Sequence, residues 1–285
     1  MGGRNRRSER VQSYASLGGL AVAALFVVHW ANAGPAEVPA APSGKPSAPH
    51  PQTQARAQVS ASSAPNPSTS SAPNPSAAPS AAPPARPQRY VVAAIGDSLT
   101  DERTYPHAYM RQLRDACPKS RWDNYGVGGN MVNQMRRRFD ADVLARGKPR
   151  YTHLIVFGGV NDVYSDKTAG RTPKKIERDL SYMYERGQKA GMQVVALTIA
   201  PWGGFKRYFN DERMAATRAV NEWIHGEKGR RVDHVVDAFG LLSCGEPEKL
   251  CEKYQKPFKD GLHFGKLGHA VLKETLQERL FPNCE

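Results

Sequence analysis

Short apolar runs alternate with longer amphipathic segments between residues 89 and 285. Five runs rich in aliphatic and β-branched residues predict strands at residues 90–95, 122–127, 153–157, 193–199 and 234–237. Apolar positions recur at helical spacing over 104–116, 172–191, 211–225 and 266–280. Thr172 and Pro173 are typical of an N-cap followed by a first-turn proline, and Gly191 of a helix end. The pattern therefore predicts strands and helices in alternation.

The predicted strands are continuously apolar, without the alternation of a half-exposed sheet. Continuous apolar strands are typical of parallel sheets with helices on both faces. We therefore predict an α/β protein with three α/β/α layers and a central, mainly parallel five-stranded sheet. In such sheets, sites form in the loops at the carboxyl ends of the strands.

Residues 34–88 are dominated by proline, alanine and serine, with almost no large apolar side chains. A degenerate repeat, Ser-Ser-Ala-Pro-Asn-Pro-Ser, occurs at 62–68 and again at 70–76. Such a composition buries too little apolar surface to offset the entropy of ordering the chain. We predict a disordered linker over 34–88 and one folded domain over 89–285.

The first 33 residues have the layout of a secretory signal. Four arginines precede an apolar run over 15–31, and Ala31-Asn32-Ala33 is a small-x-small cleavage pattern. The run is also near the shortest length that can span a membrane. Cleavage after Ala33 and retention as a membrane tether both remain open, and the long linker slightly favours the tether. We predict export to the bacterial periplasm or cell envelope.

Four cysteines lie in the predicted domain, and their even number in an exported chain predicts two disulfides. Cys244 and Cys251 are close enough to close a short loop, which leaves Cys117 to pair with Cys284. Free buried thiols are the alternative. The spacing does not indicate a zinc site, and we predict no metal and no cofactor.

The net charge is +13, of which +8 falls on residues 89–285. A basic surface suits anionic envelope polymers or lipid headgroups, although general solubility is the favoured explanation. The basic residues are not interleaved with aromatic residues in a nucleic-acid-binding motif. We therefore expect no nucleic acid partner.

Polar or glycine-rich motifs follow the first three predicted strands, and a fourth precedes the last helix. They are Gly-Asp-Ser-Leu-Thr at 96–100, Asn-Tyr-Gly-Val-Gly-Gly-Asn at 124–130, Gly-Gly-Val-Asn-Asp at 158–162 and Asp-Gly-Leu-His at 260–263. Each motif alone is common in turns. Their joint order at successive strand ends is what indicates a site.

In this order the motifs resemble the conserved blocks of the SGNH (GDSL-type) hydrolases. The resemblance covers nearly the whole predicted domain and implies a flavodoxin-like SGNH fold and a serine ester hydrolase. One departure is Asn130-Met131, where many relatives carry a small residue followed by threonine. It affects the expected geometry of that loop but not its glycine.

The resemblance also implies a role in the reaction for individual residues of these motifs. Ser98 would be the nucleophile, His263 its base, and Asp260 the carboxylate that orients the imidazole. The backbone N–H groups of Ser98 and Gly129 and the side-chain amide of Asn161 would form the oxyanion hole. His269 is the rival base, and we expect it to be structural because it falls within the last helix.

Substrate information is sparse. Trp202 and Phe205, in the loop after the fourth strand, could bind a sugar or acyl chain, or could simply pack that loop. We expect ester-bearing small molecules or envelope glycans and lipids as partners. Without an extended apolar lid segment, a small acyl group such as acetyl on carbohydrate is favoured. An O-acetyltransferase, a lysophospholipase or thioesterase, and a non-enzymatic envelope-binding module are the alternatives.

Overall fold

The computed structural model describes residues 86–285. The predictions for the signal segment, the tether at 15–31 and nearly all of the linker fall outside these residues. Within residues 86–285, no helix combines the length and the apolar character needed to cross a bilayer.

Five parallel strands form the central sheet, in the order β2-β1-β3-β4-β5. They are β1 (Val91–Gly96), β2 (Arg121–Gly126), β3 (His153–Phe157), β4 (Gln193–Leu197) and β5 (His234–Val236). Every residue of β3 is buried, and β1 is buried except at its first residue. The predicted strands are thus confirmed to within two residues at their ends.

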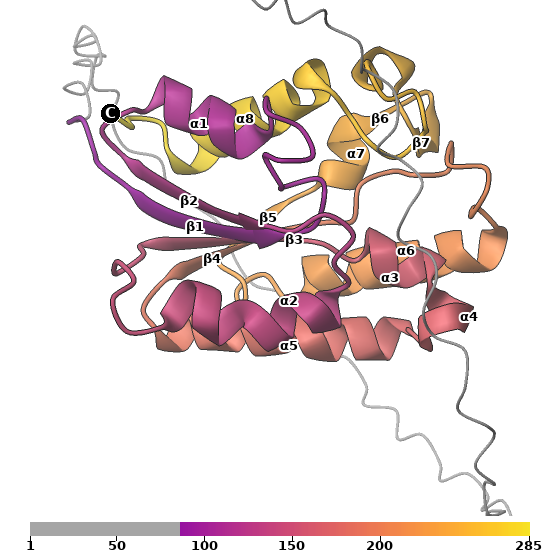
Figure 1. Cartoon of the computed structure of the whole chain (residues 1–285), viewed down its shortest axis with the longest axis horizontal. Helices are drawn as coiled ribbons and strands as arrows, with labels where there is room; N and C mark the ends of the chain where they lie inside the picture. The colour runs from indigo at the N-terminus through magenta and orange to yellow at the C-terminus, as the bar shows by residue number, and fades with distance from the viewer. Residues whose placement is uncertain (1–85) are drawn as a thin grey trace, which may run out of the picture. The chain divides into compact units, whose positions relative to one another are not determined.

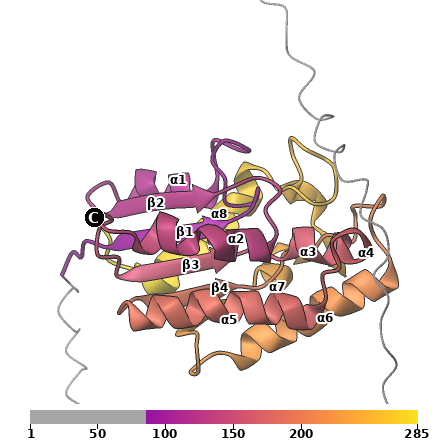
Figure 2. The same cartoon turned by 60° about the horizontal axis from the view of Figure 1, so that its bottom comes forward.

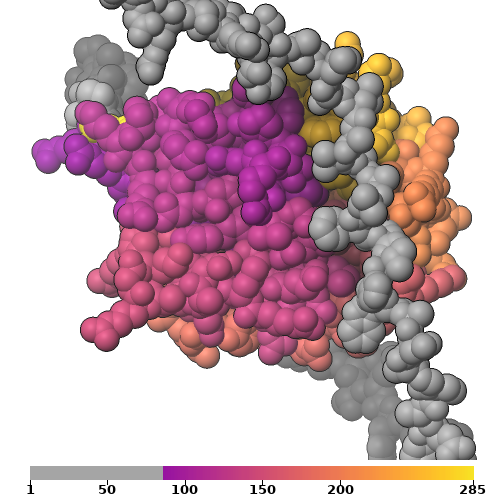
Figure 3. Space-filling view, viewed as in Figure 1, coloured from indigo at the N-terminus to yellow at the C-terminus, as the bar shows by residue number. Residues whose placement is uncertain are grey.

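Helices cover both faces of this sheet, which confirms the three-layer α/β/α fold (Figure 1). One face carries α1 (Tyr109–Ala116) and α8 (Lys266–Leu280), and the other carries α2 (Val132–Phe139), α5 (Pro173–Lys189) and α6 (Asp211–Gly226). Figure 2 shows α5 and α6 lying across the second face. In the space-filling view, the coloured residues form a closed surface on this face, with side chains over the gaps between the ribbons (Figure 3).

Shorter elements complete the domain. They are a π-helical turn (Asp140–Leu144), α3 (Val160–Tyr164), α4 (Asp166–Ala169), α7 (Ala238–Leu242), β6 (Ser243–Cys244), β7 (Glu246–Leu250) and a 3-10 turn (Glu252–Tyr254). The strands β6 and β7 pair as a small antiparallel hairpin.

Helix α5 shows how local sequence and packing agree. The Thr172 hydroxyl accepts a hydrogen bond from the Lys175 N–H, and Pro173 occupies the first turn, as predicted. Gly187 allows the helix to approach the sheet closely, because a Cβ there would lie 2.7 Å from Leu154 Cδ2. Gly191, with a φ of +79°, follows the helix end.

Two helix predictions need correction. The helix predicted over 104–116 begins only at Tyr109, because Pro106 disfavours helical geometry at the residue before it and the chain makes turns there. Helix α2 was not predicted at all. Its buried residues, Val132, Met135 and Phe139, do follow helical spacing, but three consecutive arginines obscure the short apolar stripe.

Two disulfides reinforce the domain with the pairing expected from the sequence. Cys117, at the end of α1, is bonded to Cys284 near the C-terminus. Cys244 and Cys251 close the β6–β7 hairpin. The described residues contain no free cysteine.

Candidate active site

The loops after β1, β2 and β3 meet at one edge of the sheet, because these strands are neighbours and all point the same way. The loop at 260–263, which precedes α8, reaches the same edge. Ser98 and His263 are 165 residues apart in sequence, yet Ser98 Oγ lies 3.0 Å from His263 Nε2.

The other imidazole nitrogen of His263 contacts a carboxylate. His263 Nδ1 lies 2.6 Å from Asp260 Oδ2, while Asp260 Oδ1 accepts the backbone N–H groups of Leu262 and His263 at 2.9 and 2.8 Å. Burial alone would raise the pKa of Asp260, but these hydrogen bonds and the charge of His263 outweigh it and lower that pKa. The carboxylate is thus held ionised and in a fixed orientation against the imidazole.

A tight turn presents Ser98 at the end of β1. The carbonyl of Asp97 accepts the N–H groups of Thr100 and Asp101, and Asp97 Oδ1 accepts that of Leu99 at 2.9 Å. The backbone N–H of Ser98 donates to no acceptor within the described residues. The Asp97 side chain is completely buried, which raises its pKa to about 7.

Gly129 lies in the loop after β2, which passes beside Ser98. A Cβ on the preceding residue, Gly128, would lie 3.9 Å from Ser98 Cβ. Gly129 has a φ of +76°, which favours glycine, and a Cβ added to it would meet no atom within 4 Å. Its N–H also donates to no acceptor in residues 86–285. The loop thus offers a free backbone donor beside the serine.

Asn161 is the second residue of α3, just after β3, and is only 4% exposed. Its Nδ2 donates to the Asn130 carbonyl at 3.0 Å and contacts Asp97 Oδ2 at 3.3 Å. The hydroxyl of Tyr164 donates to Asn161 Oδ1, and burial raises the pKa of Tyr164 to about 12. Tyr164 is therefore protonated, and its hydroxyl holds Asn161 Oδ1, so that Nδ2 faces the Ser98 loop.

Two charged residues that the sequence did not single out hold the glycine-rich loop in place. Asp101 Oδ2 accepts the Gly128 N–H at 3.0 Å. Arg138 donates to Asn130 Oδ1 at 2.9 Å and to the Gly96 carbonyl at 3.0 Å. Arg138 comes from α2, which was not predicted, so no sequence signal pointed to it.

His269 is a packing residue in this structure. It is 2% exposed, its Nδ1 accepts the Tyr109 N–H at 3.2 Å, and its ring stacks on Tyr105 at 5.4 Å. Burial lowers the pKa of His269 to about 3. These contacts support the expectation that it is structural.

The two aromatic residues predicted to contact substrate have different environments. Trp202 is fully buried, and its Nε1 donates to Thr217 Oγ1 at 2.9 Å, which favours the alternative that it packs its loop over the prediction that it contacts substrate. The indole satisfies its polar group inside the domain and packs the loop. Phe205 is partly buried, with ring centroids 6.0 Å from Tyr164 and 5.0 Å from Tyr208.

Residues 94–271 match the GDSL-like Lipase/Acylhydrolase family. This chain belongs to that family. It is therefore an enzyme of the GDSL-type ester hydrolase class.

Within the described residues, no group of three or more histidine, cysteine, aspartate or glutamate side chains is placed to hold a metal ion.

Individual proteins are also similar to this chain. A protein named "Uncharacterized lipoprotein YqeF" from Bacillus subtilis (strain 168) is 31% identical over 121 residues, which are 39% of this chain. The match spans about half of that relative, 48% of its length. A GDSL-like lipase from Bacteroides thetaiotaomicron shares the fold with a TM-score of 0.54 and 19% identity, over 66% of this chain and 86% of its own. An acetyl xylan esterase has a TM-score of 0.54 and 18% identity, over 67% and 99%.

Proposed function

We propose that this protein hydrolyses carboxylic esters through an acyl intermediate on Ser98. The observation that carries the proposal is the continuous contact from Ser98 Oγ to His263 Nε2 and from His263 Nδ1 to Asp260. A serine hydroxyl is a weak nucleophile near neutral pH and needs an adjacent base. His263 is placed to be that base, and Asp260 to hold the imidazole in the tautomer that leaves Nε2 free to accept.

The reaction then follows in two halves. Ser98 Oγ attacks the carbonyl carbon while its proton passes to His263 Nε2, and the tetrahedral intermediate expels the alcohol, which takes that proton. Water next attacks the acyl carbon and gives a proton to His263. When the acid leaves, Ser98 Oγ recovers the proton, so the enzyme returns to its starting state.

Negative charge develops on the carbonyl oxygen during the attack. We propose that three hydrogen-bond donors stabilise it: the N–H groups of Ser98 and Gly129 and the side-chain amide of Asn161. The two backbone groups have no other acceptor within residues 86–285. Asn161 Nδ2 would exchange one of its present contacts, the weaker being the 3.3 Å approach to Asp97, for the oxyanion. Loss of one such donor typically costs about 3 kcal/mol of transition-state stabilisation.

We further propose a small acyl group, such as acetyl on an envelope carbohydrate. Among residues 86–285, Leu267 is the one large hydrophobic residue that is exposed, so these residues offer little apolar surface to a fatty chain. The acetyl xylan esterase with the same fold acts on such a group. Phe205 remains our candidate for contact with the alcohol part of the substrate.

Export is the third part of the proposal. Two disulfides in one domain are typical of proteins that fold in an oxidising compartment. The basic and apolar segments before residue 34 are consistent with it. Fractionation of expressing bacterial cells, with thiol alkylation before and after reduction, tests it, and a cytoplasmic, fully reduced chain would contradict export.

The catalytic proposal is tested by hydrolysis of p-nitrophenyl acetate, butyrate and octanoate by the full-length chain. Ser98→Ala should abolish turnover while leaving the melting temperature nearly unchanged. Ser181→Ala, at a half-buried position of α5, is the matched control and should retain wild-type rates. A fluorophosphonate should label the Ser98 peptide in the wild type and not in Ser98→Ala.

Retention of hydrolysis by a folded Ser98→Ala variant would refute the acyl-serine pathway. A rate that rises with acyl length would refute the small-acyl substrate. Product analysis with an added sugar separates hydrolysis from transfer, because a transferase would form a sugar ester instead of free acid.

A further inference from the structure

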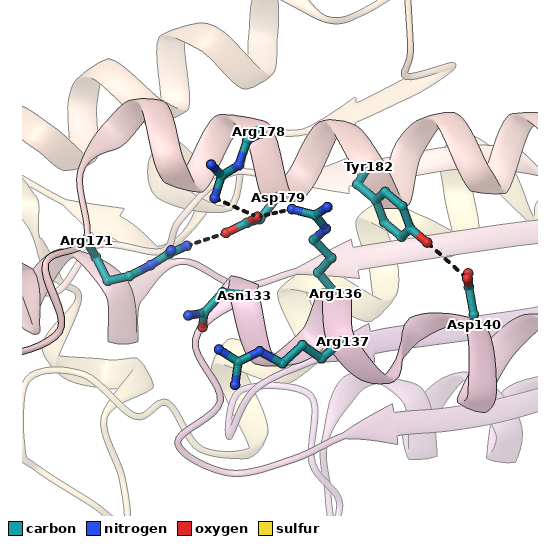
Figure 4. A pocket seen from close by; sticks show the side chains of 8 residues that line it. All are labelled: Asn133, Arg136, Arg137, Asp140, Arg171, Arg178, Asp179 and Tyr182. Carbon is teal, nitrogen blue, oxygen red and sulfur yellow. Dashed lines mark hydrogen bonds and ion pairs between the residues drawn. The ribbon is translucent and has the colours of Figure 1, made fainter. Parts of the chain in front are cut away.

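A second polar site lies apart from the Ser98 edge. A pocket of about 450 Å³ lies between α2 and α5, and four arginines line it (Figure 4). They are Arg136 and Arg137 from α2, Arg171 from the segment before α5, and Arg178 from α5. None of the residues assigned above to the nucleophile, the base or the oxyanion hole lines this pocket.

The arginines share one buried carboxylate. Asp179, whose side chain is 1% exposed, accepts from Arg136 and Arg171 at 2.8 Å each and from Arg178 at 3.5 Å. Figure 4 shows these three guanidinium groups converging on it. Burial would raise the pKa of Asp179, but the arginines outweigh that effect and lower it, so the carboxylate is ionised. Arg171 also donates to the buried Asp162 at 2.6 Å, so two carboxylates face these three guanidinium groups.

The remaining charges do not correct the imbalance. Arg137 has no carboxylate within 4 Å among the described residues. Asp140, the other acidic residue of the lining, already accepts from Tyr182 at 2.9 Å and from Arg186 at 3.2 Å. Counting Asp162, which pairs with Arg171, four arginines face three aspartates, so one positive charge is in excess. A bound anion would relieve this repulsion.

We propose that this pocket binds a phosphate group, as the free ion or as the monoester of a larger molecule. Guanidinium groups pair with phosphate oxygens through charge-assisted, often bidentate hydrogen bonds. Arg137 and Arg178 are the guanidinium groups most available to a ligand, because Arg136 and Arg171 are already hydrogen-bonded to Asp179 at 2.8 Å. Neither Arg137 nor Arg178 contacts the Ser98 machinery, so phosphate binding and ester hydrolysis are separable.

The test is calorimetric titration of the full-length chain with sodium phosphate at neutral pH, with sodium chloride used to keep the ionic strength constant. The wild type should bind one phosphate saturably. The double variant Arg137→Gln/Arg178→Gln should bind phosphate about a hundredfold more weakly, about tenfold for each charge-assisted contact. Arg146→Gln/Arg279→Gln removes the same charge from two exposed arginines elsewhere and should bind like the wild type.

Titration with glycerol 1-phosphate shows whether the ligand is the free phosphate ion or a phosphate monoester. Binding as tight as that of phosphate supports a monoester ligand, and binding of phosphate alone supports the free ion. Hydrolysis of p-nitrophenyl acetate should be unchanged in both double variants. Absence of saturable phosphate binding, or equal phosphate affinity in the two double variants, would overturn the proposal, whatever the fate of the esterase activity.

Discussion

Replacing Asp260 with asparagine tests the orientation of His263 with little change in shape. In the wild type, Asp260 Oδ1 accepts two backbone N–H groups and Oδ2 faces His263 Nδ1 at 2.6 Å. The amide oxygen of asparagine must keep the two backbone donors, so its NH2 group turns toward Nδ1. It then donates to Nδ1, and the imidazole proton moves to Nε2.

An Nε2 that carries a proton cannot accept one from Ser98 Oγ, 3.0 Å away. We therefore expect kcat for p-nitrophenyl acetate to fall by about 10⁴-fold, the loss associated with the wrong tautomer in a serine triad. That fall corresponds to about 5 kcal/mol of activation free energy. The melting temperature should change little, because both backbone hydrogen bonds remain.

The control is Asp115→Asn, which removes an exposed carboxylate paired with Arg111 on α1. It should leave kcat unchanged. A folded Asp260→Asn variant that loses less than tenfold in kcat would show that Asp260 does not set the tautomer, and the reasoning from its two backbone contacts would be wrong.

Three further outcomes follow from buried groups and cross-links. Burial raises the pKa of Asp97 to about 7, so the folded protein binds a proton that the unfolded chain releases near pH 4, and this group reduces stability as pH rises from about 4 to about 7. Asp97→Asn stays neutral, so its free energy of unfolding in urea, relative to wild type, should rise between pH 5 and pH 8. The increase should be on the order of 3 kcal/mol, and an unchanged difference would contradict the raised pKa. His269→Ala should lower the free energy of unfolding by about 2 kcal/mol and leave kcat/KM within about threefold, whereas loss of turnover with the fold intact would identify it as a base. Removing the Cys117–Cys284 disulfide by double alanine substitution should lower the melting temperature more than removing the hairpin disulfide, because the cysteines are 167 residues apart in one case and seven in the other. Equal melting temperatures would contradict that order.

The strands and the longer helices were predictable because their causes are local. The apolar runs of β1 and β3 are buried on both faces of the sheet, and Thr172-Pro173 starts α5 through its own side chains. The motif order was equally informative, since parallel strands bring their carboxyl ends to one edge whatever the loops between them do. The sequence by itself therefore determined the α/β class, the edge that carries the site, and which residues to place there.

Other features depended on partners distant in sequence. No local pattern shows that Trp202 donates a hydrogen bond to Thr217 inside the domain, or that Arg138 donates one to Asn130. Nor does any local pattern show that Asp179 pairs with several arginines. Burial, pairing and charge balance are properties of packed surfaces, and they exist only once the helices have docked on the sheet. The tertiary structure alone therefore decided how close Ser98 lies to His263, and which charges in the α2–α5 pocket lack a counterion.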